Sequence, residues 1–257
     1  MAVIALKEEA SPELEKAAKR LHWVSLGELS KAIELMQREG VQRAVMAGQV
    51  KHNKIFSSIR PDWKLAKLLF SLPRKNTDSL IGAVAKVLEE EGIQLVDSTL
   101  FLKPLLPEAG VLSRRAPSEH EAADIEYGLG VARRIAAMDI GQTVVVADRA
   151  CVAVEAMEGT DETIKRAARF ANGKPLVVVK VSKPRQDMRF DVPVVGLPTV
   201  ECMKQAGATA LAVDANRTLL FDRVKLMELA DALGIAVQAF SPVGAAEPTG
   251  VPQGKNE

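Results

Sequence analysis

Residues 138–168, MDIGQTVVVADRACVAVEAMEGTDETIKRAA, decide the fold of this chain. They contain two apolar runs, QTVVVAD at 142–148 and ACVAVEAM at 150–157, which are separated by Arg149. Consecutive β-rich runs joined by so short a connection predict a hairpin. The polar sequence that follows, over 158–173, predicts a loop that enters a helix.

Downstream and immediately upstream of this stretch, strand-like runs alternate with helical patterns. Ser118 and Glu121 have the spacing of a capping box, which predicts a long helix from Ser118 to about Met138. We expect further strands at 175–181, 192–196, 208–215 and 235–240, and helices at 198–207 and 222–233. A hairpin combined with alternating strands and helices favours an α+β arrangement with a mixed sheet.

The first third of the chain predicts a strand, two helices, a strand and then further helices. Its expected strands are 2–6, Val41–Ala47, which should be buried, and 93–99. The first expected helix has Ser11 as its N-cap and Pro12 at its first position, and the second follows Ser25 and Glu28, which have capping-box spacing. A third helix is expected from about Thr77 to Glu91. In 61–72, Trp63 and four leucines share one helical face. Core packing is the default explanation of that face, and contact with acyl chains or a bilayer is the minority hypothesis.

These patterns predict an α/β protein of two lobes with a cleft between them. Residues 1–112 form an N-terminal Rossmann-like lobe with a partial parallel sheet, and residues 113–242 form a C-terminal α+β lobe with a mixed sheet. The proline-bearing stretch 101–117 is the expected linker. Residues 243–257, rich in Pro, Gly and charge, are expected to be a disordered tail.

Composition restricts the possible partners. Lys and Arg number 34 against 33 for Asp and Glu, so no global field attracts nucleic acid. The two cysteines, Cys151 and Cys202, lack a CxxC spacing and are expected as buried thiols in a reducing compartment. The start lacks a signal-peptide pattern and no long apolar run occurs. We therefore expect a cytoplasmic protein that is at most peripheral to a membrane.

Two segments place polar residues where strands and helices end, which is where α/β proteins usually bind ligands. In the first, Glu155–Asp161, Gly159 permits a tight turn and Thr160 is expected to cap a helix whose free N–H groups suit phosphate. On spacing alone, an ordinary capped helix is the favoured explanation. Glu155 follows an apolar run and must be paired or functional if it is buried.

The second segment follows the apolar strand at 175–181. Together with Lys180 near the end of that strand, its Lys183, Arg185 and Arg189 supply enough positive charge to neutralise a pyrophosphate. Asp191 precedes another apolar run and could hold a divalent ion or position water. A solvated basic loop with local ion pairs to its aspartates explains the composition equally well.

Several familiar motifs are absent from the sequence. None of the three histidines lies in a metallophosphoesterase or zinc-protease arrangement, and no GxSxG, GxxxxGK[ST] or GxGxxG occurs. These absences argue against common acyl-transfer and nucleotide-binding machinery.

The residues of several segments resemble one known family. MDIGQTVVVADRACVAVEAMEGTDETIKRAA and the following KPLVVVKVSKPRQDMRFDVPVVGLPTV at 174–200 are similar to the signature region of the LpxI-type UDP-2,3-diacylglucosamine pyrophosphatases of lipid A synthesis. AVMAGQV at 44–50 and KNTDSLIGAVAKVLEEEGIQLVDST at 75–99 resemble the corresponding first-lobe segments. The resemblance extends from about Val3 to Phe240.

The resemblance implies magnesium-dependent hydrolysis of UDP-2,3-diacylglucosamine to UMP and 2,3-diacylglucosamine 1-phosphate, which is lipid X. It also implies two lobes that hold the lipid between them, and a homodimer. At most, the chain is expected to be peripheral to the inner membrane. The essential aspartate of the family carries over to Asp191, which would act with Mg²⁺ on the attacking water. The expected phosphate-lining residues are Lys183, Gln186 and Arg189, and the expected neighbouring wall is Glu158, Thr160 and Asp161.

One departure from the family pattern and two rival hypotheses stay open. Family members begin with a strand and a glycine-rich loop, whereas this chain is expected to open on the second strand, which would expose a sheet edge. A non-catalytic module that binds a nucleotide sugar or lipid is therefore the alternative function. A different α/β enzyme acting on another pyrophosphate is the third.

Overall fold

The computed structural model describes residues 1–48, 60–72 and 77–242. Contacts between residues divide the chain into two units. Unit 1 contains Met1–Phe101 together with Asp187–Asp191, and unit 2 contains Leu102–Gln186 and Val192–Glu257. The tail at 243–257, predicted to be disordered, lies outside the described residues.

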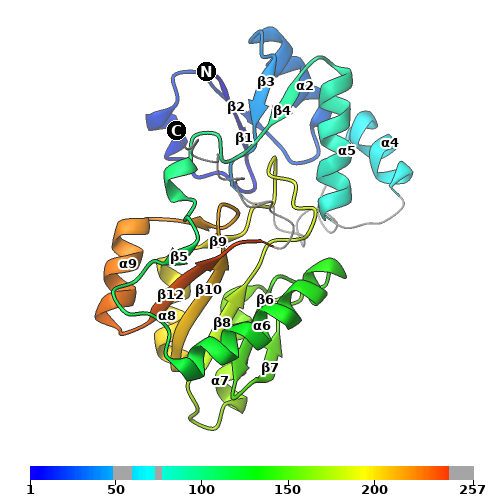
Figure 1. Ribbon diagram of the computed structural model, residues 1–257. Helices are drawn as coiled ribbons and strands as arrows, with labels where there is room; N and C mark the ends of the chain where they lie inside the picture. Colours follow the sequence, from blue (N-terminus) through cyan, green and yellow to red (C-terminus); the bar gives the residue numbers. More distant parts are fainter. Residues whose placement is uncertain (49–59, 73–76, 243–257) are drawn as a thin grey trace, which may run out of the picture. The chain divides into compact units, whose positions relative to one another are not determined.

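Unit 1 is built from two small parallel sheets and amphipathic helices (Figure 1). Strand β1 pairs with β2, and β3 pairs with β4. Its main core cluster lies where α2, α4 and α5 pack together and includes Ile33, Leu65, Leu68 and Leu88. The elements are β1 Val3–Leu6, α1 Leu14–Ala17, β2 Leu21–Val24, α2 Leu29–Arg38, β3 Arg43–Val45, α4 Trp63–Ser71, α5 Thr77–Glu90 and β4 Gln94–Val96.

Five predictions for this unit were wrong in detail. Helix α2 begins at Leu29, directly after Glu28, so Ser25 is not its N-cap, although the Ser25 N–H donates to the Glu28 side chain at 2.7 Å. Strand β2 was missed, and β3 is shorter than Val41–Ala47 and not buried, since Val45 at its end is 37% exposed. Helix α1 begins at Leu14 rather than after Ser11, whose hydroxyl accepts a bond from the Glu13 N–H in the preceding turn. Trp63 does not share the buried face of α4, because it is 80% exposed. Short strands lack the length over which periodicity is informative.

Unit 2 contains a six-stranded mixed sheet in the order β5-β12-β10-β8-β6-β7. Strands β8, β10 and β12 are parallel, whereas β6 runs antiparallel to both β8 and β7. The elements are η1 Lys103–Leu105, β5 Gly110–Val111, α6 Glu119–Ala137, β6 Thr143–Ala147, β7 Ala150–Val154, α7 Thr160–Phe170, β8 Leu176–Lys180, β9 Val194–Val195, α8 Leu197–Ala206, β10 Ala208–Asp214, β11 Leu219–Leu220, α9 Arg223–Ala232 and β12 Ala236–Phe240. The predicted hairpin and mixed sheet are confirmed.

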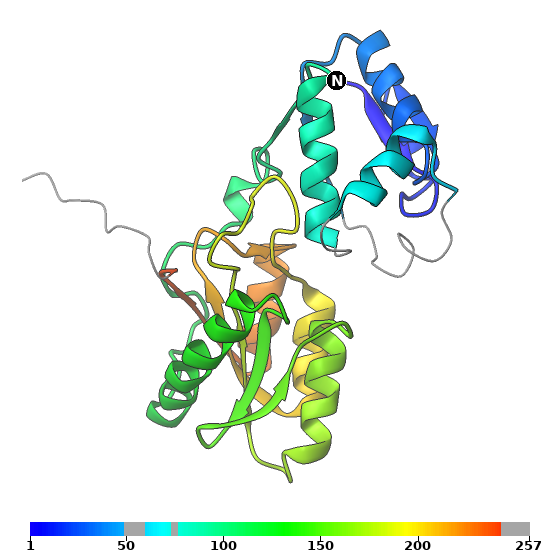
Figure 2. The ribbon, with the colours of Figure 1, turned by 90° about the vertical axis from the view of Figure 1, so that its right-hand side faces the viewer.

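The valine-rich strands are explained by helices on both faces of this sheet (Figure 2). Val144, Val177 and Val179 belong to the core cluster that contains residues of α6. Val145 and Val178 belong to the other cluster, which contains residues of α7, α8 and α9. A strand that is buried on both faces has no polar alternation, so it appears as a continuous apolar run.

The long helix α6 also fixes the hairpin. Ser118 and Glu121 form the predicted capping box at its start. Asp124, which is 1% exposed, accepts hydrogen bonds from the N–H groups of Asp148 and Arg149 at 3.2 and 2.5 Å. Both turn residues have left-handed backbone, with φ of 51° and 56°, as two-residue hairpin turns of this kind require. The buried carboxylate therefore stabilises the turn between β6 and β7.

Candidate functional site

The basic loop leaves the sheet at a buried anchor. Directly after β8, the N–H and the hydroxyl of Ser182 both donate to one carboxylate oxygen of Asp214, each at 2.8 Å. Asp214 ends β10 and is 2% exposed. The carboxyl ends of two neighbouring parallel strands are thus joined, and the predicted cationic loop begins at the edge of the sheet where α/β proteins bind ligands.

Two predicted phosphate-lining residues, Lys183 and Gln186, lie in the first turn of this loop. The ammonium of Lys183 pairs with Asp139 at 2.8 Å. The side-chain oxygen of Gln186 accepts a hydrogen bond from the Lys183 N–H at 3.2 Å. Arg185, between them, is exposed. Local pairing therefore accounts for part of the positive charge in this loop.

Asp191 and Arg189 fall in the part of the loop that belongs to unit 1. Two guanidinium nitrogens of Arg189 donate to the carboxylate of Asp187, at 2.9 and 2.7 Å. The guanidinium also lies 5.9 Å from the centre of the Phe190 ring. This hydrogen-bonded pair lowers the pKa of the Asp187 carboxyl. Asp191 is exposed and has a left-handed backbone with φ of 55°. Non-glycine residues are uncommon in that region, and aspartate is one of those that adopt it most readily.

The second predicted segment lies at the start of α7, and one prediction there was wrong. Gly159, with φ of 85°, occupies the N-cap position that was expected for Thr160. The Thr160 hydroxyl instead donates to Glu155 at 2.9 Å and receives a hydrogen bond from Lys180 at 2.6 Å. Gly159 is needed because the chain must turn through a positive φ before the helix.

The other two residues of this segment have structural partners. Glu158 pairs with Arg166 at 2.5 Å and also accepts a bond from the Ala156 N–H, and its pKa is lowered. Backbone hydrogen bonding is the main cause of that shift, with the Arg166 hydrogen bond adding to it against the opposing effect of burial. Asp161 accepts a hydrogen bond from Thr199 at 2.8 Å, which links α7 to α8.

A buried polar cluster in unit 2 was only partly recognised from the sequence. Glu155 and Lys180 are 8% and 9% exposed, and both bind the Thr160 hydroxyl. The Gln142 N–H also donates to Glu155, at 3.2 Å. Glu155 is therefore paired, which answers the question that its apolar context raised. Lys180 was predicted as one of four cations that could neutralise a pyrophosphate. The structure instead places it at the end of β8, where it is buried and donates to Thr160.

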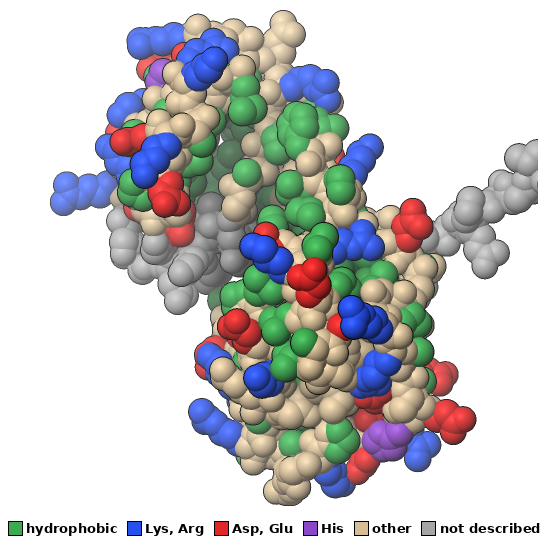
Figure 3. Space-filling model, turned by 90° about the vertical axis from the view of Figure 1, so that its left-hand side faces the viewer, with side chains coloured by type: hydrophobic (Ala, Val, Ile, Leu, Met, Phe, Trp, Pro, Cys, Tyr) green, Lys and Arg blue, Asp and Glu red, His purple; other side chains and the backbone are tan. Residues whose placement is uncertain are grey.

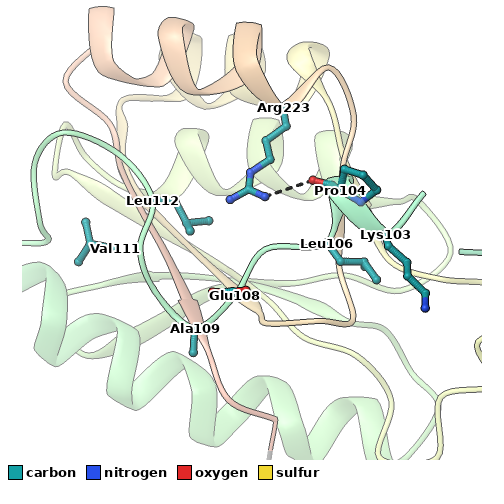
Figure 4. A pocket seen from close by; sticks show the side chains of 8 residues that line it. All are labelled: Lys103, Pro104, Leu106, Glu108, Ala109, Val111, Leu112 and Arg223. Carbon is teal, nitrogen blue, oxygen red and sulfur yellow. Dashed lines mark hydrogen bonds between the residues drawn. The ribbon is translucent and has the colours of Figure 1, made fainter. Parts of the chain in front are cut away.

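The depression in Figure 4 does not contain the predicted residues. It measures about 500 Å³ and is lined by Lys103, Pro104, Leu106, Glu108, Ala109, Val111, Leu112 and Arg223. The Arg223 guanidinium is turned toward the Pro104 carbonyl and donates to it at 3.2 Å. The candidate residues in the loop after β8 and at the start of α7 therefore stay predictions from the sequence.

Comparison with protein families covers both units. A model described as the LpxI N-terminal domain matches residues 1–105, and one described as the LpxI C-terminal domain matches residues 108–238. The chain belongs to the LpxI family. It is also 33% identical over 251 residues to the UDP-2,3-diacylglucosamine pyrophosphatase LpxI of Caulobacter vibrioides, covering 94% of this chain and 89% of that protein.

Membership of the LpxI family confirms the predicted resemblance. The assignments of Asp191, Arg189, Lys183, Gln186, Glu158, Thr160 and Asp161 to the site stay predictions, as does the domain boundary at 112–113. Among the residues that the structure describes, no three His, Cys, Asp or Glu side chains gather as a metal cluster, and no helix is long and apolar enough to cross a membrane. On the face drawn in Figure 3, basic and acidic side chains are interspersed.

Proposed function

We propose that this chain hydrolyses UDP-2,3-diacylglucosamine to UMP and 2,3-diacylglucosamine 1-phosphate. The observation that carries the proposal is the alignment over 94% of the chain with a relative named for that pyrophosphatase activity. Asp191 supports it independently, because an exposed carboxylate on a left-handed backbone beside a cationic loop is a suitable group to act on a water molecule.

The chain's own residues supply positioning and proton transfer. The Asp191 carboxylate accepts a proton from water as the water oxygen bonds to one phosphorus of the diphosphate. The bond between that phosphorus and the bridging oxygen breaks, and its electron pair leaves with the other phosphate. Lys183, Gln186 and Arg189 bind the phosphate oxygens, and the wall at Glu158, Thr160 and Asp161 adjoins them in this proposal. The two products are phosphate monoesters.

A magnesium ion fits this residue set as a partner of the substrate. Mg²⁺ is commonly bound through one or two carboxylates together with substrate phosphates and several waters, so it needs no all-protein cage. The absence of a three-ligand cluster among the described residues is compatible with that mode. Asp191, which is exposed, would hold the ion. When bound, Mg²⁺ neutralises charge on the phosphate oxygens.

Helix α4 supports peripheral contact with a membrane as part of the same proposal. Trp63 and Phe70 are 80% and 92% exposed, and Lys67 lies between them at helical spacing, whereas Leu65 and Leu68 are buried on the opposite face. The helix contains no acidic residue. Exposed aromatic side chains beside lysine suit the interface of an anionic bilayer, where a diacylated substrate resides.

The remaining parts of the proposal concern assembly and location. Cys151 and Cys202 are free thiols, which supports work in the reducing cytoplasm, at the inner face of the membrane. The homodimer that the family resemblance implies stays a prediction, which light scattering of the purified chain would test.

The deciding experiment compares Asp191→Asn with wild type for UMP release from UDP-2,3-diacylglucosamine, with Mg²⁺ and with a chelator. Asparagine tolerates left-handed backbone, so the fold is retained. Loss of a general base lowers kcat by about 100- to 10,000-fold. The matched control is Asp222→Asn, because Asp222 is also exposed and left-handed, with φ of 50°, but lies outside the predicted site.

Each outcome has a distinct meaning. Full turnover by Asp191→Asn would refute the site assignment, and turnover unaffected by the chelator would refute the role of Mg²⁺. If wild type is thermally stabilised by a UDP-sugar or by lipid X but releases no UMP, the chain is a binding module and the enzyme proposal is wrong. Reaction in ¹⁸O-water shows which phosphorus is attacked, because the label appears in either UMP or the lipid phosphate.

A further inference from the structure

Five residues of the basic loop, Asp187–Asp191, are packed in unit 1 although the strands on both sides belong to unit 2. We call this segment the strap. Figures 1 and 2 both show it as a yellow loop beside α5. Ser98, which follows β4, donates from both its N–H and its hydroxyl to the Met188 carbonyl, at 2.8 and 2.9 Å. The backbone of the strap is therefore held by unit 1.

The side chain of Phe190 makes the second attachment. It is 7% exposed and belongs to a small core cluster with Ile81, Ala85 and Leu95 of unit 1. Ile81 and Ala85 lie on helix α5. Leu88 of the same helix belongs instead to the main core cluster of the unit. An apolar ring that fills its own small cluster fixes the direction of the backbone on either side of it.

The strap is also braced internally. The paired hydrogen bonds from Arg189 to the Asp187 carboxylate close the turn. The Phe190 N–H also donates to the Asp187 carbonyl, at 3.2 Å. Asp191 follows directly on Phe190 and has the left-handed φ of 55°. The buried Phe190 ring therefore precedes Asp191 directly in the chain.

We propose that Phe190 is a positioning residue for the hydrolysis, through which unit 1 sets the orientation of the Asp191 carboxylate. The inference rests on the proposed function, since it concerns the residue that acts on water there. Residues 1–101 thereby contribute to the reaction through their packing on Phe190, although none of the predicted site residues lies among them. The contribution is geometric and acts on the transition state rather than on substrate binding.

The test compares Phe190→Ala with Phe190→Leu, using kcat and KM for UMP release from UDP-2,3-diacylglucosamine. Misplacement of a catalytic group by about 1 Å lowers the rate by up to about 100-fold, so we expect Phe190→Ala to lower kcat by about 10- to 100-fold with KM little changed. Phe190→Leu, which still fills the cluster, restores most of kcat. Leu88→Ala is the matched control. Leu88 is 6% exposed and lies on α5, the helix that carries Ile81 and Ala85, but it belongs to the main core cluster of unit 1 rather than to the cluster of Phe190.

Thermal unfolding and far-UV circular dichroism verify that each variant is folded at the assay temperature. If Phe190→Ala does not fold, Phe190→Leu and Ser98→Ala carry the test, with a smaller drop in kcat expected for each. Wild-type kcat in folded Phe190→Ala, or an equal drop in Leu88→Ala, would overturn the inference. If wild type releases no UMP, the proposed function is wrong and the inference about Phe190 fails with it. If Asp191→Asn loses activity but Phe190→Ala keeps the wild-type kcat, the proposed function stands and only the role of Phe190 is refuted.

Discussion

Two glycines of helix α6, Gly128 and Gly130, lie two positions apart and so on nearly opposite faces of the helix, and they should respond differently to the same substitution. A Cβ added at Gly128 would lie 2.7 Å from Cγ2 of Val179 and 3.1 Å from Cγ2 of Val146, inside the contact between helix and sheet. A Cβ added at Gly130 meets nothing closer than the end of the Arg134 side chain, at 4.0 Å. Gly128→Ala and Gly130→Ala are therefore a matched pair on one helix.

The magnitudes follow from two opposing effects. Alanine is more favourable than glycine in a helix by about 0.8–1 kcal/mol, so Gly130→Ala should stabilise unit 2 by about that amount. Gly128→Ala gains the same propensity but must displace the side chain of Val179, which is fully buried. Overpacking of this kind costs about 1–3 kcal/mol, so the net effect ranges from about zero to about 2 kcal/mol of destabilisation.

Thermal unfolding followed by circular dichroism measures the difference. One kcal/mol corresponds to about 2–4 °C in Tm for 150–250 residues, so Gly130→Ala should melt higher than Gly128→Ala by about 2–12 °C. Equal stabilisation by both substitutions would refute the close packing of α6 on the sheet at Gly128. A loss of stability in Gly130→Ala would refute the exposure assigned to that position.

Two further predictions concern pH and membranes. Burial raises the pKa of Glu121, but hydrogen bonds led by that of Arg115 outweigh it and lower the pKa to about 2, so its stabilising effect is present above about pH 4.3 and is lost as the pH falls toward 2. Glu121→Gln should therefore be about 2–3 kcal/mol less stable near neutral pH, and a gap that stayed constant in unfolding measurements down to about pH 3 would contradict the assignment. Replacing Trp63 and Phe70 together by Ala should reduce co-sedimentation with anionic vesicles, whereas Phe170→Ala, at a residue of unit 2 that is 64% exposed, should not. Equal losses in both variants would show that α4 has no special role.

The parts of the fold that sequence predicted well are those where one local pattern has one physical cause. The valine runs of β6 and β8 are buried on both faces, and the Ser118 capping box satisfies donors within a single turn. The misses are short or exposed elements. Strand β2 has only four residues, and Trp63 fits the apolar period of α4 but lies on its solvent side. Period alone does not specify which neighbours an apolar side chain meets.

The candidate site shows the same limit more sharply. The pattern of the basic loop correctly suggested ion pairs with its aspartates, because Arg189 and Asp187 are close in sequence and their pairing is local. The attachment of Phe190 depends on Leu95, which is 95 positions away and belongs to the other half of the sequence. No periodicity within the loop encodes that partner. A local pattern can therefore nominate Asp191, but the feature that would make its carboxylate effective is long-range packing, and only variants of Phe190 separate the two contributions.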